Sequence, residues 1–416
     1  MGVNVFPAAS SGSSYISQPP VATATALASG VLTSASTTIS VTGNGTGATL
    51  ITSAPAIVTI NGVEYATQAN TPLQTQGFTG AQTVKIAQPY AIGTWTAITT
   101  GLSLTCGGIA SNNNNTWVYM IWNGGTTQTT FYYSTDNGST WSSGTLPSAA
   151  TFSNNSVIYG GGYFVAIGGN STTGYYSTNG TSWTSFALPS ATGGVNNVLY
   201  GNGTFVWSGS GTQTIGYMST SSMGTVSTSL APNSGYYRLG TYYNGYFMMY
   251  DIVSSNFISS SGTLSSTGWQ TTTSITSPGT YSIISSPTAM VGSSSNTTLQ
   301  INTSYRPYFI NGVYNYGIAT ATTSPIGVDG LAYGGGIWIG GNTAATATYI
   351  YSRNESIRTW TSAATPNAYA RTAIAYSNGQ FIAAGNAQAG IFKMTLSPGT
   401  ASQPINFGIY NSTTAR

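Results

Sequence analysis

The residues that could carry acid–base chemistry are scarce in this chain. Its 416 residues include 5 acidic and 8 basic side chains and no histidine. Glycoside hydrolysis ordinarily needs two facing carboxylates, and general acid–base catalysis needs a titratable group beside the reacting bond. Cys106 is the single cysteine, which allows neither an internal disulfide nor a cysteine-based metal site. We therefore expect a protein that is not an enzyme, with no catalytic residue, no metal and no cofactor.

Aromatic side chains are the more promising chemical feature. Tyr and Trp provide rigid amphipathic surfaces, and aromatic faces stack on the C–H faces of sugars. Several of them fall outside the repeat described below and include a tyrosine-dense stretch. Six residues are candidate ligand contacts: Trp122, Trp207, Tyr236, Tyr237, Tyr242 and Arg238. Oligomer contacts and plain surface packing are the alternative explanations for the same residues.

The composition excludes several classes of protein. Only 3% of the residues are charged, whereas a soluble domain carries roughly 25%. The 12% aromatic content argues against disorder. The Lys and Arg residues form no cluster, so we expect no nucleic acid partner. No apolar run is long enough to cross a bilayer, and the N-terminal segment lacks the regions of a Sec signal, so we expect no membrane insertion.

The elements that must position any site are repeats. A phrase of Gly, any residue and an aromatic residue ends at 164, 205, 247, 338 and 381, with a looser copy at Trp117. Its spacing is 41 to 47 residues, except for one gap of 91 between 247 and 338. That gap holds two periods, which predicts a degenerate copy near Met290. The chain therefore contains seven copies.

A second phrase follows each first phrase and joins Tyr, Ser and Thr to a polar turn and a Trp. It ends at Trp141, Trp183 and Trp360, with weaker versions at Val226 and Trp269 and a further one expected near Tyr314. Asn, Asp and Gly tolerate positive φ in such turns, and we expect the Trp to pack under the turn. Asp136 is therefore a turn residue, and the repeat tryptophans are packing residues: Trp95, Trp141, Trp183, Trp269 and Trp360.

Residues 134–141 match the pattern S-x-D-x-G-x-x-W, and over about residues 93–395 the chain resembles sialidase-like (BNR or Asp-box) β-propellers. The resemblance implies a propeller. In the enzymes it would also imply three arginines, an acidic acid/base, and a Tyr activated by a Glu. Arg238, Arg306 and Arg371 fall in different repeats, but Arg306 occupies a different position within its repeat. Glu64 and Glu355 are the only candidates to activate a Tyr.

Each repeat holds four short strand-like runs, which is the pattern of a propeller blade. We predict an all-β, seven-bladed β-propeller with a small N-terminal β module. The strand around Trp95 completes the blade that also holds Phe381 and Phe392. The expected domains are an extended arm at 1–35, a β anchoring module at 36–90, the propeller at 91–396 and a loop-like tail at 397–416.

The composition and architecture resemble exterior structural proteins of tailed bacteriophages. The expected function is therefore that of a virion fibre, spike or decoration protein on the virion exterior. Residues 1–90 would attach to other virion proteins, and the propeller would face outward and bind host-surface glycans. We expect a homo-oligomer. The alternatives are a bacterial surface adhesin and a glycan hydrolase of sialidase-like type.

Overall fold

The computed structural model divides the chain into two compact units. One holds residues 1–93 and 396–416, and the other holds residues 94–395. The structure describes residues 26–45, 47–60, 62–75, 78–98, 105–122, 125–152, 156–169, 172–189, 197–243, 245–251, 256–260, 264, 269–271, 282–285, 290–293, 298–302, 308–310, 313–315, 320–323, 328–342, 348–353, 360–365, 371–385, 390–397, 399 and 404–411.

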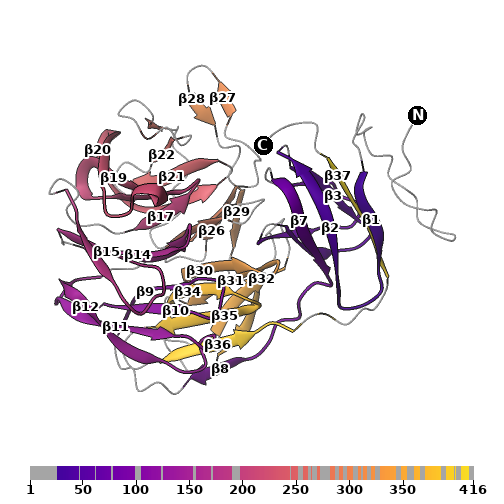
Figure 1. Cartoon of the computed structure of the whole chain (residues 1–416), viewed down its shortest axis with the longest axis horizontal. Helices are drawn as coiled ribbons and strands as arrows, with labels where there is room; N and C mark the ends of the chain where they lie inside the picture. The colour runs from indigo at the N-terminus through magenta and orange to yellow at the C-terminus, as the bar shows by residue number, and fades with distance from the viewer. Residues whose placement is uncertain are drawn as a thin grey trace. The chain divides into compact units, whose positions relative to one another are not determined.

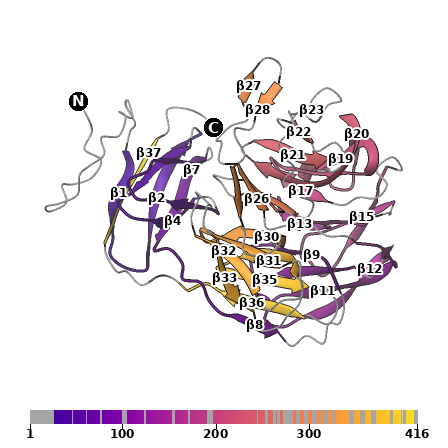
Figure 2. The same ribbon diagram turned by 180° about the vertical axis from the view of Figure 1, so that it is seen from behind.

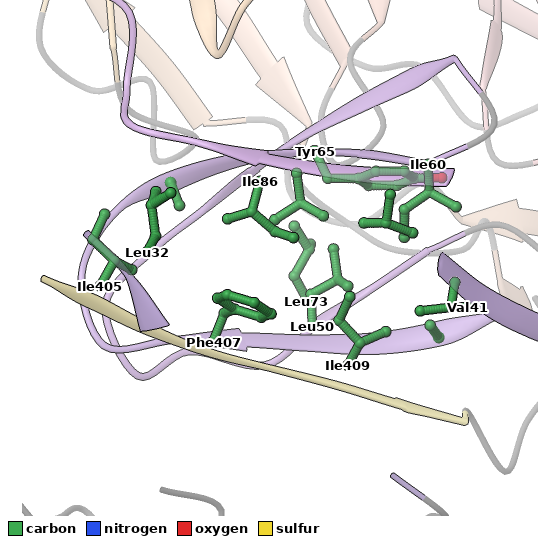
Figure 3. Packing of buried hydrophobic residues seen from close by; sticks show 14 of the residues in the cluster. Leu32, Val41, Leu50, Ile60, Tyr65, Leu73, Ile86, Ile405, Phe407 and Ile409 are labelled. Carbon is green, nitrogen blue, oxygen red and sulfur yellow. The ribbon is translucent and has the colours of Figure 1, made fainter. Parts of the chain in front are cut away.

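The first unit contains two four-stranded sheets. One sheet has the order β1 (Ala26–Leu32), β37 (Ile405–Asn411), β3 (Ala48–Thr52) and β6 (Leu73–Gln74). The other has the order β2 (Ser36–Asn44), β7 (Thr79–Ala87), β4 (Ala56–Ile60) and β5 (Val63–Thr67). One apolar cluster draws on both sheets, including Leu50 and Phe407 from the first and Val41 and Ile86 from the second (Figure 3). We call this unit the sandwich module.

Two predicted boundaries of this unit are wrong. The tail at 397–416 is not all loop, because β37 pairs with β1 on one side and with β3 on the other. The arm at 1–35 does not end outside the module, because β1 is one of its strands. In β37 the apolar residues Ile405, Phe407 and Ile409 alternate with residues on the opposite face, and all three are buried. The sequence shows this period of two, but a run of seven residues is too short for the period alone to distinguish a strand from a loop.

The second unit is built from sheets arranged around a common centre (Figure 1, and from behind in Figure 2). The first two sheets are β9 (Thr105–Ser111), β10 (Trp117–Trp122), β11 (Gln128–Ser134) and β12 (Ser142–Ala150), then β13 (Val157–Gly160), β14 (Tyr163–Ile167), β15 (Thr173–Ser177) and β16 (Thr184–Ala187). A seven-stranded sheet follows, with β17 (Val198–Gly201), β18 (Thr204–Ser208), β19 (Ser210–Ser219), β20 (Ser227–Tyr243), β21 (Tyr246–Asp251), β22 (Asn256–Ser260) and β23 (Gln270–Thr271). A 3-10 turn at Thr220–Ser222 lies between β19 and β20.

Three four-stranded sheets complete the second unit. They are β24 (Ser282–Ser285), β25 (Met290–Ser293), β26 (Thr298–Asn302) and β29 (Thr320–Thr323), then β30 (Val328–Gly334), β31 (Ile337–Asn342), β32 (Thr348–Ser352) and β33 (Thr361–Ala364), and finally β34 (Arg371–Ser377), β35 (Gln380–Gly385), β36 (Ile391–Thr395) and β8 (Trp95–Ile98). The degenerate copy predicted near Met290 is the strand β25.

The long strand β20 serves two sheets in succession. Its first part pairs with β19, and from Tyr237 onward it pairs with β21. Divided there, the described strands of the second unit form seven sets of four, apart from a separate two-stranded hairpin, β27 (Tyr308–Ile310) and β28 (Val313–Asn315). The first strands of the sets lie beside one another in the order β9, β13, β17, β20, β24, β30 and β34, and β34 lies beside β9. The seven-blade count itself stays a prediction.

The last sheet joins distant parts of the sequence as predicted. β8 pairs antiparallel with β36, with Trp95 opposite Met394 and Ala97 opposite Phe392. Phe381 lies in β35 of the same sheet. This pairing confirms that the strand around Trp95 completes the blade of Phe381 and Phe392.

The recurring Gly-x-aromatic phrase is a two-residue hairpin turn between the first and second strands of a blade. Its glycine has a φ of +89° at Gly162, +72° at Gly203 and +74° at Gly379. The preceding residue also has positive φ where the structure describes it, as at Asn202 and Asn378. Two successive positive φ values define the type I′ turn, which favours Asn-Gly and matches the twist of paired strands.

The second phrase expected near Tyr314 is misplaced. Tyr314 lies in β28 (Val313–Asn315), which forms a separate two-stranded sheet with β27 (Tyr308–Ile310). The third strand of that blade is β26, and this hairpin is inserted between it and the fourth strand β29. The insertion shifts the spacing on which the prediction rested. Among the described residues, no helix is long and apolar enough to span a membrane.

Candidate functional site

The one full copy of the S-x-D-x-G-x-x-W pattern folds as a turn organised by Asp136. Its Oδ1 accepts hydrogen bonds from the backbone N–H of Thr140 (2.8 Å) and Ser139 (3.0 Å) and from the Ser134 hydroxyl (2.8 Å). Its Oδ2 accepts the Thr140 hydroxyl at 2.6 Å. Trp141 donates its Nε1–H to the carbonyl of Gly138 at 3.3 Å, so this Trp packs under its own turn as expected.

These hydrogen bonds control the titration of Asp136. Partial desolvation raises the pKa of the carboxyl, but the hydrogen bonds from Thr140, Ser134 and Ser139 outweigh it and lower the pKa to about 2. A carboxyl held ionised by its own turn is poorly suited to donate a proton near neutral pH. The geometry agrees with a structural role for Asp136.

A second turn repeats this geometry without a charge. At residues 177–183, Asn179 Oδ1 accepts the backbone N–H groups of Thr181 and Ser182, both at 2.9 Å. Ser177 Oγ accepts from Gly180 N at 2.8 Å, as Ser134 Oγ accepts from Gly138 N at 2.8 Å. The turn therefore needs an acceptor oxygen two residues after the Ser, and an amide supplies it as well as a carboxylate does.

Several repeat tryptophans pack between neighbouring sheets, which differs from the prediction that each packs under its own turn. The Trp183 ring lies 5.7 Å from that of Phe131 in the preceding blade. Trp95 makes the same kind of edge contact, also at 5.7 Å, with Tyr349. Trp269 donates to the hydroxyl of Ser229 at 2.9 Å. All of them, like Trp360, are buried. The fourth strand of a blade therefore anchors to the blade before it.

A second aromatic residue also recurs in the blades, one that the predicted motifs do not include. In five blades a Tyr of the first strand lies opposite the aromatic residue of the Gly-x-aromatic phrase, with ring centroids 4.7 to 4.9 Å apart. The pairs are Tyr159 with Phe164, Tyr200 with Phe205, Tyr242 with Phe247, Tyr333 with Trp338 and Tyr376 with Phe381. In the sequence, each of these Tyr residues precedes its aromatic partner by five residues, and this constant spacing could have predicted the pairs.

These tyrosines also cover glycines of the preceding blade. A Cβ atom on Gly160 would overlap the ring of Tyr200, and one on Gly201 would overlap Tyr242. Gly334 has the same relation to Tyr376. Tyr242, a predicted ligand contact, is thus half-buried in packing between blades, and burial raises its pKa.

The remaining candidate ligand contacts separate into three groups. Trp207 is fully buried against Phe186, so the prediction that it contacts a ligand is wrong. Tyr237 is 2% exposed, and the prediction fails there for the same reason. The backbones of Tyr236 and Arg238 lie in β20, but their side chains are outside the described residues. Trp122, at the end of β10, is 38% exposed.

The charged residues required by the hydrolase alternative are only partly described. Glu64 lies in β5 of the sandwich module and is half-buried. The side chains of Arg238, Arg306, Arg371 and Glu355 are outside the described residues. In the described part of the chain no cluster of three His, Cys, Asp or Glu side chains could hold a metal ion. Burial raises the pKa of the Cys106 thiol to about 12, which keeps it protonated and unreactive.

Comparison with known proteins defines the class of fold. No protein-family model and no curated protein matches the chain. Among solved structures it is similar to YCF48 bound to D1 peptide, with 16% identity and a TM-score of 0.54 over 74% of this chain and 95% of that one. It is also similar to a catalytically inactive virginiamycin B lyase from Staphylococcus aureus with quinupristin, with 12% identity and a TM-score of 0.57 over 74% of this chain and 100% of that one. The WD40 propeller of Doa1 is 12% identical, with a TM-score of 0.52 over 74% of this chain and 98% of that one.

Likenesses at this identity show the fold alone. The chain is a β-propeller protein with an additional β-sandwich module. The propeller part of the predicted resemblance is confirmed. The narrower resemblance to sialidase-like propellers and to phage proteins stays a prediction.

Proposed function

We propose that this protein is a non-catalytic structural protein of the exterior of a tailed phage particle. Its sandwich module attaches to other virion proteins, and its propeller presents a binding surface to host glycans. The observation that carries this proposal is topological. The propeller, residues 94–395, is inserted between strands β1–β7 and strand β37 of the sandwich module. A display protein needs two units of this kind, one for attachment and one for presentation.

The connection between the units supports a separation of roles. Ala91 and Ser397 form an isolated antiparallel bridge, with Ala91 N donating to Ser397 O at 2.8 Å and Ser397 N to Ala91 O at 3.3 Å. The chain therefore leaves the sandwich module for the propeller, and returns from it, next to the same bridged pair of residues. Each unit has apolar clusters of its own, so each has the core that independent folding needs.

The distribution of acidic side chains supports a role without catalysis. Among those the structure describes, Glu64 lies in the sandwich module, Asp136 is held in its turn and Asp251 is buried at the end of β21. The pKa of Asp136 is lowered to about 2 by the hydrogen bonds of its turn, so this carboxyl is poorly suited to the general acid that a glycosidase of the usual kind requires.

Trp122 is the residue that best fits a glycan contact. It is exposed, while Trp207 and Tyr237 are buried. An exposed indole offers an apolar face to the C–H face of a sugar and an N–H to its hydroxyls.

The test is to find the protein on particles. Antibody labelling in electron microscopy and mass spectrometry of purified virions, from the culture whose phage genome encodes the chain, should place it on the particle exterior. Absence from intact particles, with secretion into the medium instead, would favour an adhesin and contradict the proposal.

A further inference from the structure

Among the described strands, β2 lies at the edge of its sheet in the sandwich module and lacks the usual residues that prevent pairing with other chains. It is one of the two longest strands that end a described sheet, with nine residues. The other, β12, contains Pro147. β2 has neither proline nor a charged residue, and its sequence is Ser-Thr-Thr-Ile-Ser-Val-Thr-Gly-Asn. Natural edge strands usually carry such residues to prevent pairing with other chains.

The hydrogen bonds around β2 show which backbone groups face outward. Gly45 N donates to Phe78 O at 2.9 Å, and Gln88 N donates to Ala35 O at 2.9 Å. In an antiparallel ladder these bonds alternate, so the odd-numbered residues of β2 bond to β7. The N–H and C=O groups of Thr38, Ser40 and Thr42 therefore point away from β7, and within the described part of the chain they meet no partner. Their side chains are exposed as well.

We propose that β2 pairs antiparallel with β2 of a second copy of this chain, about a two-fold axis at Ser40. The inference is independent of the proposed function. In this register Thr38 lies opposite Thr42 on the exposed face, and Ile39 lies opposite Val41 on the core face.

Two properties favour a second copy over another strand. The outward-facing residues fall opposite one another in this register, as hydrogen-bonded pairs require, and Ser40 pairs with its own copy. Self-pairing also brings no like charges together, because β2 carries none. The two modules would then share one continuous sheet, joined at β2, with the order β5, β4, β7, β2 on each side of the axis.

The test is the mass of the full chain in solution, measured by light scattering after size-exclusion chromatography. The wild type should have the mass of two chains. Ser40→Pro removes an N–H that β7 does not use, so the variant should fold and have the mass of one chain. Ser40→Lys and Ser40→Glu should each be one chain at low salt, because like charges meet on the axis. An equimolar mixture of the two should restore the mass of two.

Ser185→Lys is the matched control, because Ser185 is an exposed serine in the outer strand β16 of a blade. It should keep the mass of two chains. A wild type with the mass of one chain would overturn the proposal and would leave β2 to another segment or protein. Ser40→Lys and Ser40→Glu variants that both keep the wild-type mass would place the interface elsewhere and overturn it too, even if Ser40→Pro failed to fold.

Discussion

The ring of Tyr200 occupies the space where a side chain at position 160 would lie. The blade that contains Tyr200 therefore packs its aromatic ring directly against the backbone of Gly160 in the preceding blade. The same relation recurs between Tyr242 and Gly201 and between Tyr376 and Gly334. Because the contact repeats, its disruption at one interface is a local test of how blades are held together.

Gly160→Ala should destabilise the propeller by about 1 to 3 kcal/mol, the usual cost of overpacking, because the new Cβ overlaps the Tyr200 ring. Urea unfolding measures this. The double-mutant cycle with Tyr200→Ala should give strongly non-additive free energies, since the smaller residue vacates the space. Additive effects would show that Tyr200 does not seat on Gly160.

Asp136→Asn should be tolerated better than Asp136→Ala, because Asn179 organises the equivalent turn through its amide oxygen. Asp136→Ala loses the acceptor for several hydrogen bonds at an exposed site, and we expect a loss of about 1 kcal/mol. Thermal unfolding of the two variants checks the order. Equal losses would mean that the acceptor oxygen is not what the turn requires.

The pH dependence of Asp136 has a defined sign. Its pKa of about 2 in the folded protein is lower than in the unfolded chain, so ionisation stabilises the fold above about pH 4. That contribution is lost as the pH falls toward 2. An NMR titration of the carboxyl should give the low value, and Asp136→Asn should lack this part of the acid destabilisation. A carboxyl that titrates near 4 would contradict it.

Trp183→Ala should cost about 3 to 5 kcal/mol, because the ring is buried and packs on Phe131 of the neighbouring blade. Trp122→Ala should cost less than Trp183→Ala, because 38% of the Trp122 side chain is exposed whereas Trp183 is buried. If the propeller binds glycans, Trp122→Ala should reduce binding on a glycan array. Tyr237 is buried, so we expect no contact between its side chain and the ligand. Binding that persists unchanged would remove Trp122 from the site.

Incubation with sialosides and host polysaccharides should give no turnover. Proton transfer requires a poised acid or base, and the chain has no histidine and 5 acidic residues. Release of sialic acid or of reducing ends, lost in Glu355→Gln, would contradict the non-catalytic proposal.

The sequence predicts the propeller well because its signals are local and repeated. Asn202-Gly203 and Asn378-Gly379 mark type I′ turns through backbone conformation alone, and the half-repeats at Trp95 and Phe381 predict their own pairing. What it does not reveal depends on tertiary contacts. Trp207 and Trp122 are both outside the repeat, and only packing against Phe186 decides that the first is core. The pairing of β37 with β1 likewise spans almost the whole chain.

The proposal that the sandwich module attaches to the particle, and that the propeller does not, is tested most directly by splitting the protein at Ala91 and Ser397. Because these residues are bridged antiparallel, an Asn-Gly linker can join them and remove the propeller from the sandwich module. The spliced module should fold and be incorporated into virions, whereas residues 94–395 alone should fold and remain free, as scored by mass spectrometry of purified particles. Deleting residues 1–85 is a poorer test, because it leaves β37 without β1 and β3. Incorporation of the isolated propeller, with exclusion of the spliced module, would contradict the account.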